Sequence, residues 1–289
     1  MSMWLDLVEC AHSIAYVQAG AIRTRYVEAG RAQDEALIFL HGSGGYLEAY
    51  QRNIAAHSER FRVLVPDMLG HGFSDKPDYP YEPHVYVEHL LRFMDALGVE
   101  RAHFSGESLG GWVAARLAAS HPGRVGKLVL NTAAGVHFDP VVSARIHELS
   151  IKAASAPSRE TVRARMEWLM LDPTRVTDEM VELRYRVYCQ PGFAQAMKNI
   201  MCLHTAEYRL PNLLTPQELA SIKAPTLVVW TSHDPGSSVA IGKQLADAIP
   251  GAEFVVIDNC GHWPQFEDAE HFNQVHLSFL SSERARNAV

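Results

Sequence analysis

The sequence has few cysteines and no long apolar run. Four cysteines occur in 289 residues and none forms a C-x-x-C pair, so a disulfide framework is not indicated, and free thiols in a reducing compartment are expected. No apolar stretch approaches the roughly 20 residues of a membrane-spanning helix. The first residues, Met1 to Leu7, lack the basic start and long apolar core of a secretory signal. The sequence therefore predicts a cytoplasmic protein without a membrane segment.

Positive charge is also scarce. Lys and Arg total 26 against 33 Asp and Glu, which gives a formal net charge of −7. No basic run opposes this balance, so a nucleic-acid partner is not expected. Internal repeats and low-complexity segments are absent from the sequence. The composition, 47% hydrophobic and 20% charged, is typical of a globular protein whose length suits one large domain or a core with an inserted subdomain.

Apolar runs alternate with helical patterns along most of the chain. Continuous apolar runs predict strands buried on both faces, and 3.6-residue periodicity predicts helices. After an edge hairpin before residue 35, strands are expected at 36–40, 61–65, 102–105, 127–131, 226–230 and 253–257, and helices at 50–58, 85–97, 109–121, 238–249 and 266–280. This alternation predicts an α/β fold with a mostly parallel sheet and helices on both faces.

Residues 135–213 interrupt the alternation. They carry only helical patterns, which prolines separate. A helical block between two halves of a sheet indicates a cap over the core. The predicted organisation is an N-terminal core part at 1–134, a helical cap at 135–213 and a C-terminal core part at 214–289.

The sequence Gly106-Glu107-Ser108-Leu109-Gly110 lies between a predicted strand and a predicted helix. A serine hydroxyl becomes an effective nucleophile when a base takes its proton and donors stabilise the oxyanion. A sharp strand-to-helix turn exposes the Ser108 hydroxyl and directs the backbone N–H of Leu109 toward the developing charge. We therefore predict that Ser108 is the nucleophile, although a simple glycine-rich turn is the structural alternative.

Two more side chains follow the last two predicted strands. Asp234 follows the first of them, and His262 follows the second. Functional groups gather at the carboxyl ends of parallel strands, and the order Ser108, Asp234, His262 is that of hydrolases with this kind of turn. His262 is predicted to be the general base and Asp234 its orienting acid. Separately, Asp234 could be a turn or cap residue and His262 could be structural.

An earlier loop, His41-Gly42-Ser43-Gly44-Gly45, also follows a strand. It can supply a second N–H to the oxyanion, from Ser43 or Gly44, beside that of Leu109; a plain glycine-rich turn is the alternative. The next loop, which contains Asp67 and His71, is predicted to be a structural turn. A metal site there is not expected, because no further ligands converge by spacing.

Together these motifs resemble the α/β-hydrolase family over nearly the whole chain. They are H-G-S-G-G, P-D-x-x-G-H-G-x-S, G-E-S-L-G-G and the Asp and His loops. The serine at 108 differs from the aspartate of the dehalogenases and epoxide hydrolases of this fold. Within the family, the segment 41–44 and Cys260-Gly261-His262-Trp263 are most similar to the meta-cleavage product hydrolases.

That resemblance implies hydrolysis of a C–C bond in 2-hydroxy-6-oxo-dienoates, the ring-fission products of aromatic degradation. It implies a small-molecule substrate and no cofactor. Dimers and larger assemblies occur in the family, and the sequence does not decide between a monomer and a homo-oligomer.

The resemblance also implies substrate-binding residues. Arg184 stands where the family has an arginine for the substrate carboxylate, a task that suits the forked guanidinium, and Trp263 would grip the same end. A solvated helix residue is the alternative for Arg184. The family has asparagine at Glu107 and near Ala49. An ionised Glu107 about 6 Å from a substrate carboxylate would cost roughly 3 kcal/mol, unless Glu107 is neutral, pairs with Arg184 or points elsewhere, or the substrate lacks that carboxylate.

Two other functions remain open at this point. A carboxylesterase or lactonase could use the same triad, and its leaving group would need no dienolate stabilisation, so Arg184→Ala would matter little. A non-catalytic binding protein on a hydrolase scaffold is the third hypothesis. Covalent labelling of Ser108 by a fluorophosphonate would exclude it.

Overall fold

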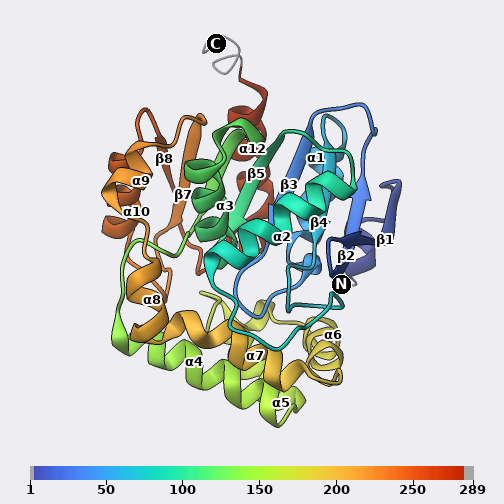
Figure 1. Cartoon of the computed structure of the whole chain (residues 1–289). Helices are drawn as coiled ribbons and strands as arrows, with labels where there is room; N and C mark the ends of the chain where they lie inside the picture. The colour runs from blue at the N-terminus through green and yellow to red at the C-terminus, as the bar shows by residue number, and fades with distance from the viewer. Residues whose placement is uncertain (1–2, 283–289) are drawn as a thin grey trace.

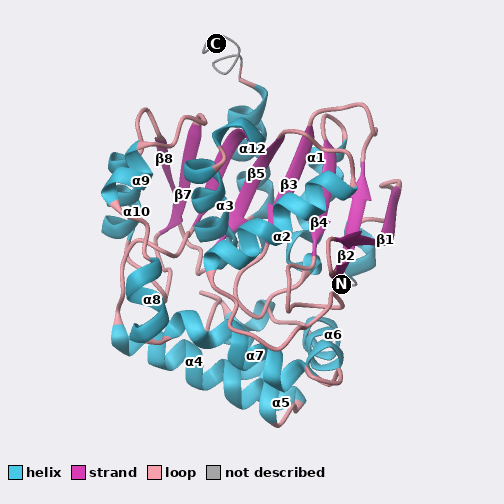
Figure 2. Ribbon diagram, in the orientation of Figure 1, coloured by secondary structure: helices cyan, strands magenta, loops and turns pink. Residues whose placement is uncertain are grey.

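The computed structural model describes residues 3–282, and its centre is an eight-stranded sheet (Figures 1 and 2). The strand order is β1-β2-β4-β3-β5-β6-β7-β8. The strands are β1 His12–Ala19, β2 Ile22–Ala29, β3 Ala36–Leu40, β4 Arg62–Pro66, β5 Ala102–Glu107, β6 Val125–Asn131, β7 Thr226–Thr231 and β8 Glu253–Ile257. β1 and β2 form an antiparallel hairpin, β2 pairs antiparallel with β4, and the other neighbours are parallel. The predicted α/β fold is confirmed.

Helices cover both faces of the sheet and one of its ends. They are α1 Gln51–Ser58, α2 Pro83–Ala96, α3 Leu109–Ser120, α4 Pro140–Ser155, α5 Arg159–Glu167, α6 Asp178–Tyr188, α7 Phe193–Met201, α8 Ala206–Asn212, α9 Pro216–Ala220, α10 Val239–Ala248, α11 Pro264–Glu267 and α12 Ala269–Ser281. Short 3-10 helices lie at Met3–Asp6, Leu47–Tyr50, Pro122–Arg124, Pro173–Arg175 and Cys202–His204. None of the helices within residues 3–282 combines the length and apolar character needed to cross a bilayer.

The chain between β6 and β7 contains α4 to α9. Figure 1 shows α4 to α7 as a layer across the lower end of the sheet, with α8 leading back toward the core. We propose that residues 135–213 of this segment form the cap. The predicted final helix at 266–280 is instead two helices, α11 and α12. The backbone of Asp268 between them is non-helical, with φ −134° and ψ 62°, and this break leaves Glu267 facing the loop before α11.

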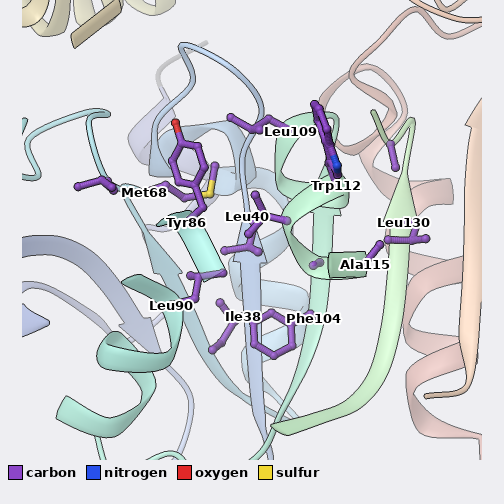
Figure 3. Packing of buried hydrophobic residues seen from close by; sticks show 14 of the residues in the cluster. Ile38, Leu40, Met68, Tyr86, Leu90, Phe104, Leu109, Trp112, Ala115 and Leu130 are labelled. Atoms are coloured by element: carbon purple, nitrogen blue, oxygen red, sulfur yellow. The ribbon is translucent and has the colours of Figure 1, made fainter. Parts of the chain in front are cut away.

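Alternate strand residues supply two apolar layers, one on each face of the sheet. Ile38, Leu40 and Phe104 pack toward α2 and α3, as Figure 3 shows, whereas Leu37 and Phe39 pack toward α1 and α12. Successive side chains of a strand point to opposite faces, so a strand covered on both sides must be apolar throughout. This is why β3 is a continuous apolar run.

Two glycines bring α3 into close contact with β5 and β3. A Cβ on Gly106 would lie 2.3 Å from the backbone of Gly110, and a Cβ on Gly110 would lie 2.2 Å from the carbonyl oxygen of Leu40. Real Cβ atoms do not approach backbone atoms so closely, and the backbone cannot yield as a flexible side chain can. Glycine at both positions therefore permits the tight turn from β5 into α3.

We expect Gly110→Ala to lower the free energy of unfolding by about 1–3 kcal/mol, because overpacking against fixed backbone costs that much. Gly123→Ala is the matched control, since a Cβ at position 123 would have no atom within 4 Å. Urea denaturation monitored by circular dichroism measures both values. Equal stability of the two variants would contradict the close-packing argument.

Candidate active site

Ser108 lies at the turn between β5 and α3, in a strained backbone conformation. Its φ of 53° and ψ of −113° are unfavourable for a residue with a Cβ and cost on the order of 1–3 kcal/mol. Its backbone N–H donates to the carbonyl of Asn131 at 3.0 Å, and its carbonyl accepts from Ala134 at 3.0 Å and Trp112 at 3.1 Å. These bonds to the neighbouring strand and helix maintain the strain. The Ser108 side chain lines a cavity with about 860 Å³ of empty space, its open mouth included.

The cavity lies between the carboxyl ends of the parallel strands and the helical layer. From the sheet, the loops after five strands line it, with residues that include Ser43, Ser108, Ala133, Asp234 and His262. From the layer, residues of α4, α5 and α8 line the other wall. The structure therefore brings the three predicted triad residues to one cavity.

The loop before α11 positions His262 through backbone hydrogen bonds. Its backbone N–H donates to the carbonyl of Leu169 in the helical layer at 2.7 Å. The Glu267 carboxylate accepts from the backbone N–H groups of Gly261 and Leu171, each at 2.9 Å. Burial raises the pKa of Glu267, while these donors act in the opposite direction. The loop that carries His262 is thus hydrogen-bonded to the segment that follows α5 in the helical layer.

The imidazole of His262 lies between two carboxylates. Its Nδ1 is 2.9 Å from Asp234 Oδ1, and its Nε2 is 3.0 Å from Glu107 Oε1. Asp234 Oδ1 also accepts from the backbone N–H of Gly236 at 2.7 Å, which fixes the carboxylate in place. The predicted contact of Asp234 with His262 is therefore present in the geometry. Within residues 3–282, no hydrogen bond joins His262 to the hydroxyl of Ser108.

The two carboxylates set the protonation of His262. Burial alone would lower the pKa of this histidine, but Asp234 and Glu107 outweigh it and raise the pKa to about 10. A hydrogen bond and a negative charge on each side both favour the charged ring. At neutral pH the ring is therefore an imidazolium that donates one N–H to each carboxylate.

Glu107 points toward His262 and the oxyanion loop. Its side chain is 2% exposed, and a Cβ on Gly42 would lie 2.5 Å from its Oε2, so glycine at 42 leaves room for the carboxylate. Glu107 therefore contacts His262 and does not pair with Arg184, which was one of the alternatives left open by the sequence. Its charge nevertheless contributes to the raised pKa of Arg184, after the opposing effect of burial and the effects of Tyr188 and Tyr46.

The two sides of the predicted oxyanion site both reach the cavity. Ser43 and Leu109 line it. Gly44 does not line it, has a φ of 70°, and accepts a hydrogen bond from the Tyr188 hydroxyl at 3.1 Å through its carbonyl. Of the two donors considered in the loop, Ser43 therefore has the better position.

Arg184 is a buried residue of α6. It is 1% exposed, so it is not a solvated helix residue. Its guanidinium carbon lies 5.1 Å from the ring centre of Tyr46, 5.3 Å from that of Trp263 and 6.0 Å from that of Tyr188. Trp263 lines the cavity, whereas Arg184 does not. The arginine is in contact with the aromatic wall of the site rather than at its surface.

Sequence reasoning missed several basic residues of the cavity wall. Arg165, Arg209, His137 and His204 line it. One signal was present: Arg165 lies between Val162 and Met166 on the buried face of α5, where an apolar residue would be usual. Charged side chains are rarely fully buried unless they are paired. For the two histidines and Arg209, the sequence pattern gives no comparable signal.

The loop with Asp67 is structural, as its pattern indicates. The Asp67 carboxylate pairs with Arg25 at 2.6 Å and accepts from the backbone N–H groups of Leu47 and Phe73, both at 2.8 Å. Burial lowers the pKa of His71 well below its usual value. In the described part of the chain, no group of three or more His, Cys, Asp or Glu side chains is arranged to hold a metal ion.

Comparison with known proteins agrees with this architecture. Residues 35–269 match the model of a family described as alpha/beta hydrolase fold. The chain belongs to the α/β-hydrolase fold family. This hydrolase-fold chain is 32% identical to the 2-hydroxymuconate semialdehyde hydrolase of Pseudomonas putida, over 93% of its own length and 94% of the relative's. The family expected from the motifs is confirmed.

Two further likenesses concern the same group of enzymes. The hydrolase-fold chain is 33% identical to the 2-hydroxy-6-oxononadienedioate/2-hydroxy-6-oxononatrienedioate hydrolase of Paraburkholderia phymatum, over 90% of this chain and 91% of that protein. A solved structure of the meta-cleavage product hydrolase from Pseudomonas fluorescens IP01 is 29% identical, has a TM-score of 0.80 and covers 94% of this chain and 98% of its own.

Glu107→Gln is expected to lower the pKa of His262, because it removes one of the two negative charges that favour the imidazolium. A pKa of about 10 in the folded state and about 6.5 in the unfolded state means that ionisation of His262 stabilises the fold fully below pH 6.5 or so. This stabilisation decreases as pH rises and is lost above about 10. In Glu107→Gln, the stabilisation that comes from ionisation of His262 should disappear at a lower pH than in the native protein.

Imidazole carbon chemical shifts during a pH titration measure the pKa directly, and urea denaturation at several pH values measures the stability. Glu28→Gln is a suitable control, since Glu28 pairs with Arg62 at the sheet and does not contact His262. An unchanged titration of His262 in Glu107→Gln would contradict the two-carboxylate geometry.

Proposed function

We propose that this protein is a serine hydrolase that cleaves the C–C bond of 2-hydroxy-6-oxo-dienoate ring-fission products. The observation that carries the proposal is the Asp234–His262 pair facing the same cavity as a serine on a strained strand-to-helix turn. The likeness to meta-cleavage product hydrolases over about nine-tenths of the chain supports the choice of bond.

The first step that we propose is a proton transfer to the substrate. Cleavage between C5 and C6 of the dienoate leaves an electron pair on C5, so C5 must first become saturated, next to a C3=C4 double bond that is conjugated with a C2 ketone. This ketonisation adds a proton to C5, and the C2 hydroxyl releases its proton to solvent, from which His262 regains one at the end of the cycle. The His262 imidazolium, with its pKa of about 10, retains a proton at neutral pH and is the donor.

Loss of that proton changes the partner of His262. A neutral Nε2 carries a lone pair, which repels the Glu107 carboxylate and accepts a hydrogen bond instead. Ser108 directly follows Glu107 in the chain, and its hydroxyl becomes the new donor to His262 Nε2. His262 is then the general base that the serine requires, while Asp234 keeps the ring oriented from the other side.

Ser108 Oγ next attacks C6, and its proton passes to His262. The backbone N–H groups of Leu109 and Ser43 stabilise the oxyanion. When the C5–C6 bond breaks, its electron pair is delocalised into the C2 ketone as a dienolate, which takes the proton from His262 and leaves as the 2-hydroxydienoate. Water, deprotonated by His262, then hydrolyses the acyl-serine and releases the carboxylic acid. Trp263, which lines the cavity, and Arg184, which packs behind it with Nε and Nη2 free to donate to a carboxylate, stabilise the dienoate end.

Ser108→Ala should lower kcat for a ring-fission product by at least about a thousandfold, as loss of a nucleophile does in comparable triads. The fall in the visible absorbance of the yellow dienoate measures the rate. A fluorophosphonate should label the native protein at Ser108 and leave the variant unlabelled. Rapid hydrolysis of p-nitrophenyl esters with no turnover of several dienoates would favour a carboxylesterase or lactonase.

Glu107→Gln should affect the two kinds of substrate in opposite directions. An ester needs neutral His262 from the start, so a lower pKa should raise kcat/KM for p-nitrophenyl acetate at pH 7 by about tenfold for each pKa unit lost. A dienoate needs the imidazolium first, so its ketonisation should become slower. Stopped-flow absorbance resolves ketonisation from cleavage. A parallel fall in both activities would show that Glu107 has only a structural role.

A further inference from the structure

The wall of the cavity that belongs to the helical layer is basic. Arg165 on α5, His204 in the short helix Cys202–His204, and Arg209 on α8 all line the cavity. The two arginines are 4% and 7% exposed. Burial and the charges of both arginines lower the pKa of His204 well below its usual value. His204 is therefore neutral, and the positive charge of the cluster that the three side chains form belongs to the two arginines.

The hydrogen-bond partners of the two arginines in the described part of the chain are neutral oxygens. Arg165 donates through Nε to the Ser150 hydroxyl at 2.9 Å, and Arg209 donates to the carbonyl oxygens of His137 and Leu203, each at 3.1 Å. Among residues 3–282, these oxygens are their hydrogen-bond partners, although the more distant charge of Glu107 also acts to raise the pKa of Arg165.

Burial lowers the pKa of each of the two arginines to about 10. The guanidinium carbons of Arg165 and Arg209 also lie 5.7 and 5.2 Å from the ring centres of Trp168 and Trp112. A buried charge without an adjacent counter-ion still destabilises a fold, so an anionic ligand would stabilise this wall.

Several buried nitrogens of residues that line the cavity, from the helical layer and from the core, have no hydrogen-bond partner. They are Arg165 Nη1, Trp112 Nε1, His137 Nδ1 and His204 Nδ1. Arginine and tryptophan nitrogens are donors and cannot accept, so at least two of these groups require an acceptor. A carboxylate supplies acceptor oxygens and a negative charge together. The cluster therefore has the chemistry of a carboxylate site.

Arg184 leaves this cluster free for a second carboxylate. The family resemblance assigns the dienoate carboxylate to Arg184, which packs against Trp263 and Tyr46 and is not part of the basic wall. A substrate with one carboxylate, held by Arg184, would leave the charges of Arg165 and Arg209 unpaired in the complex. A substrate with a second carboxylate would neutralise them.

We propose that Arg165, His204 and Arg209 bind a second carboxylate, carried by the acyl portion of the substrate, so that the substrate is a dienedioate. This inference rests on the proposed C–C hydrolase function, which it makes more specific. Cleavage of such a substrate releases a dicarboxylic acid from the acyl-serine, with one carboxylate in the basic cluster and the other formed at the original C6.

A matched pair of ligands tests the site. 2-Hydroxy-6-oxonona-2,4-dienedioate and 2-hydroxy-6-oxonona-2,4-dienoate differ only in a terminal carboxylate against a methyl group. Ser108→Ala should bind the dienedioate about 10- to 100-fold more tightly, the range that one or two charge-assisted hydrogen bonds supply. Titration of the visible absorbance of each ligand measures its Kd. Equal affinity for the two ligands would overturn the proposal.

Substitution of Arg165 identifies the residues responsible. In the Ser108→Ala background, Arg165→Met should reduce the preference for the dienedioate to about threefold or less, and it should leave the melting temperature unchanged or higher because a buried charge is removed. Arg163→Met is the control on the same helix. Arg163 is half-buried, pairs with Asp178 and does not line the cavity, so the preference should persist. Equal weakening of both ligands by Arg165→Met would overturn the proposal.

Turnover by the native enzyme separates this inference from the proposed function. Cleavage of both dienoates with equal kcat/KM, and no preference in binding, would refute the second carboxylate site and leave the C–C hydrolase function intact. No cleavage of either compound, with the binding preference retained and lost in Arg165→Met, would refute the C–C hydrolase function and support the carboxylate site.

Discussion

An imidazole held between two buried carboxylates is the interaction on which the chemistry of this protein depends. Asp234 and Glu107 contact opposite nitrogens of His262, and each favours the charged ring. In a triad with a single carboxylate, the ring is poised to accept a proton. Here it begins with one, and Glu107 competes with the adjacent serine for the same nitrogen. A reaction that first consumes a proton suits this arrangement better than one that only requires a base.

This arrangement relies on the frame around it. The histidine and Asp234 follow parallel strands β8 and β7, and Glu107 ends β5, so the sheet brings together groups that are far apart in sequence. The close approach of α3 at Gly106 and Gly110 determines where Ser108 lies. Gly42 allows the Glu107 carboxylate to reach the ring. These glycines therefore determine which charges surround His262 as well as how α3 packs on the sheet.

Much of the frame could be predicted from the sequence, because strands buried on both faces must be largely apolar, as β3, β4, β6 and β7 are, and the edge strand β8 has a similar apolar run. The turn at Ser108 and the loops of Asp234 and His262 could be located because parallel strands place their ends together. The partner of Glu107 could not be predicted, since it depends on side-chain torsions and on the space at Gly42. The break at Asp268 was missed because apolar periodicity continues across it.

Arg184 and Arg165 show a second limit. A sequence indicates that a helix has a buried face, but not whether an arginine on it meets rings, carboxylates or a cavity. For Arg184 the answer is three aromatic rings, and for Arg165 it is the cavity. Both depend on how α5 and α6 pack on the core, which is a property of the assembled tertiary structure.

The attachment of the helical layer to the histidine loop has a mechanical consequence. The carbonyl of Leu169 accepts from the His262 backbone, and Glu267 accepts from Leu171. A movement that lifts the link after α5 must therefore break both bonds or drag the imidazole with it. The part of the layer that follows α5 therefore cannot move away as an independent lid while His262 stays in place.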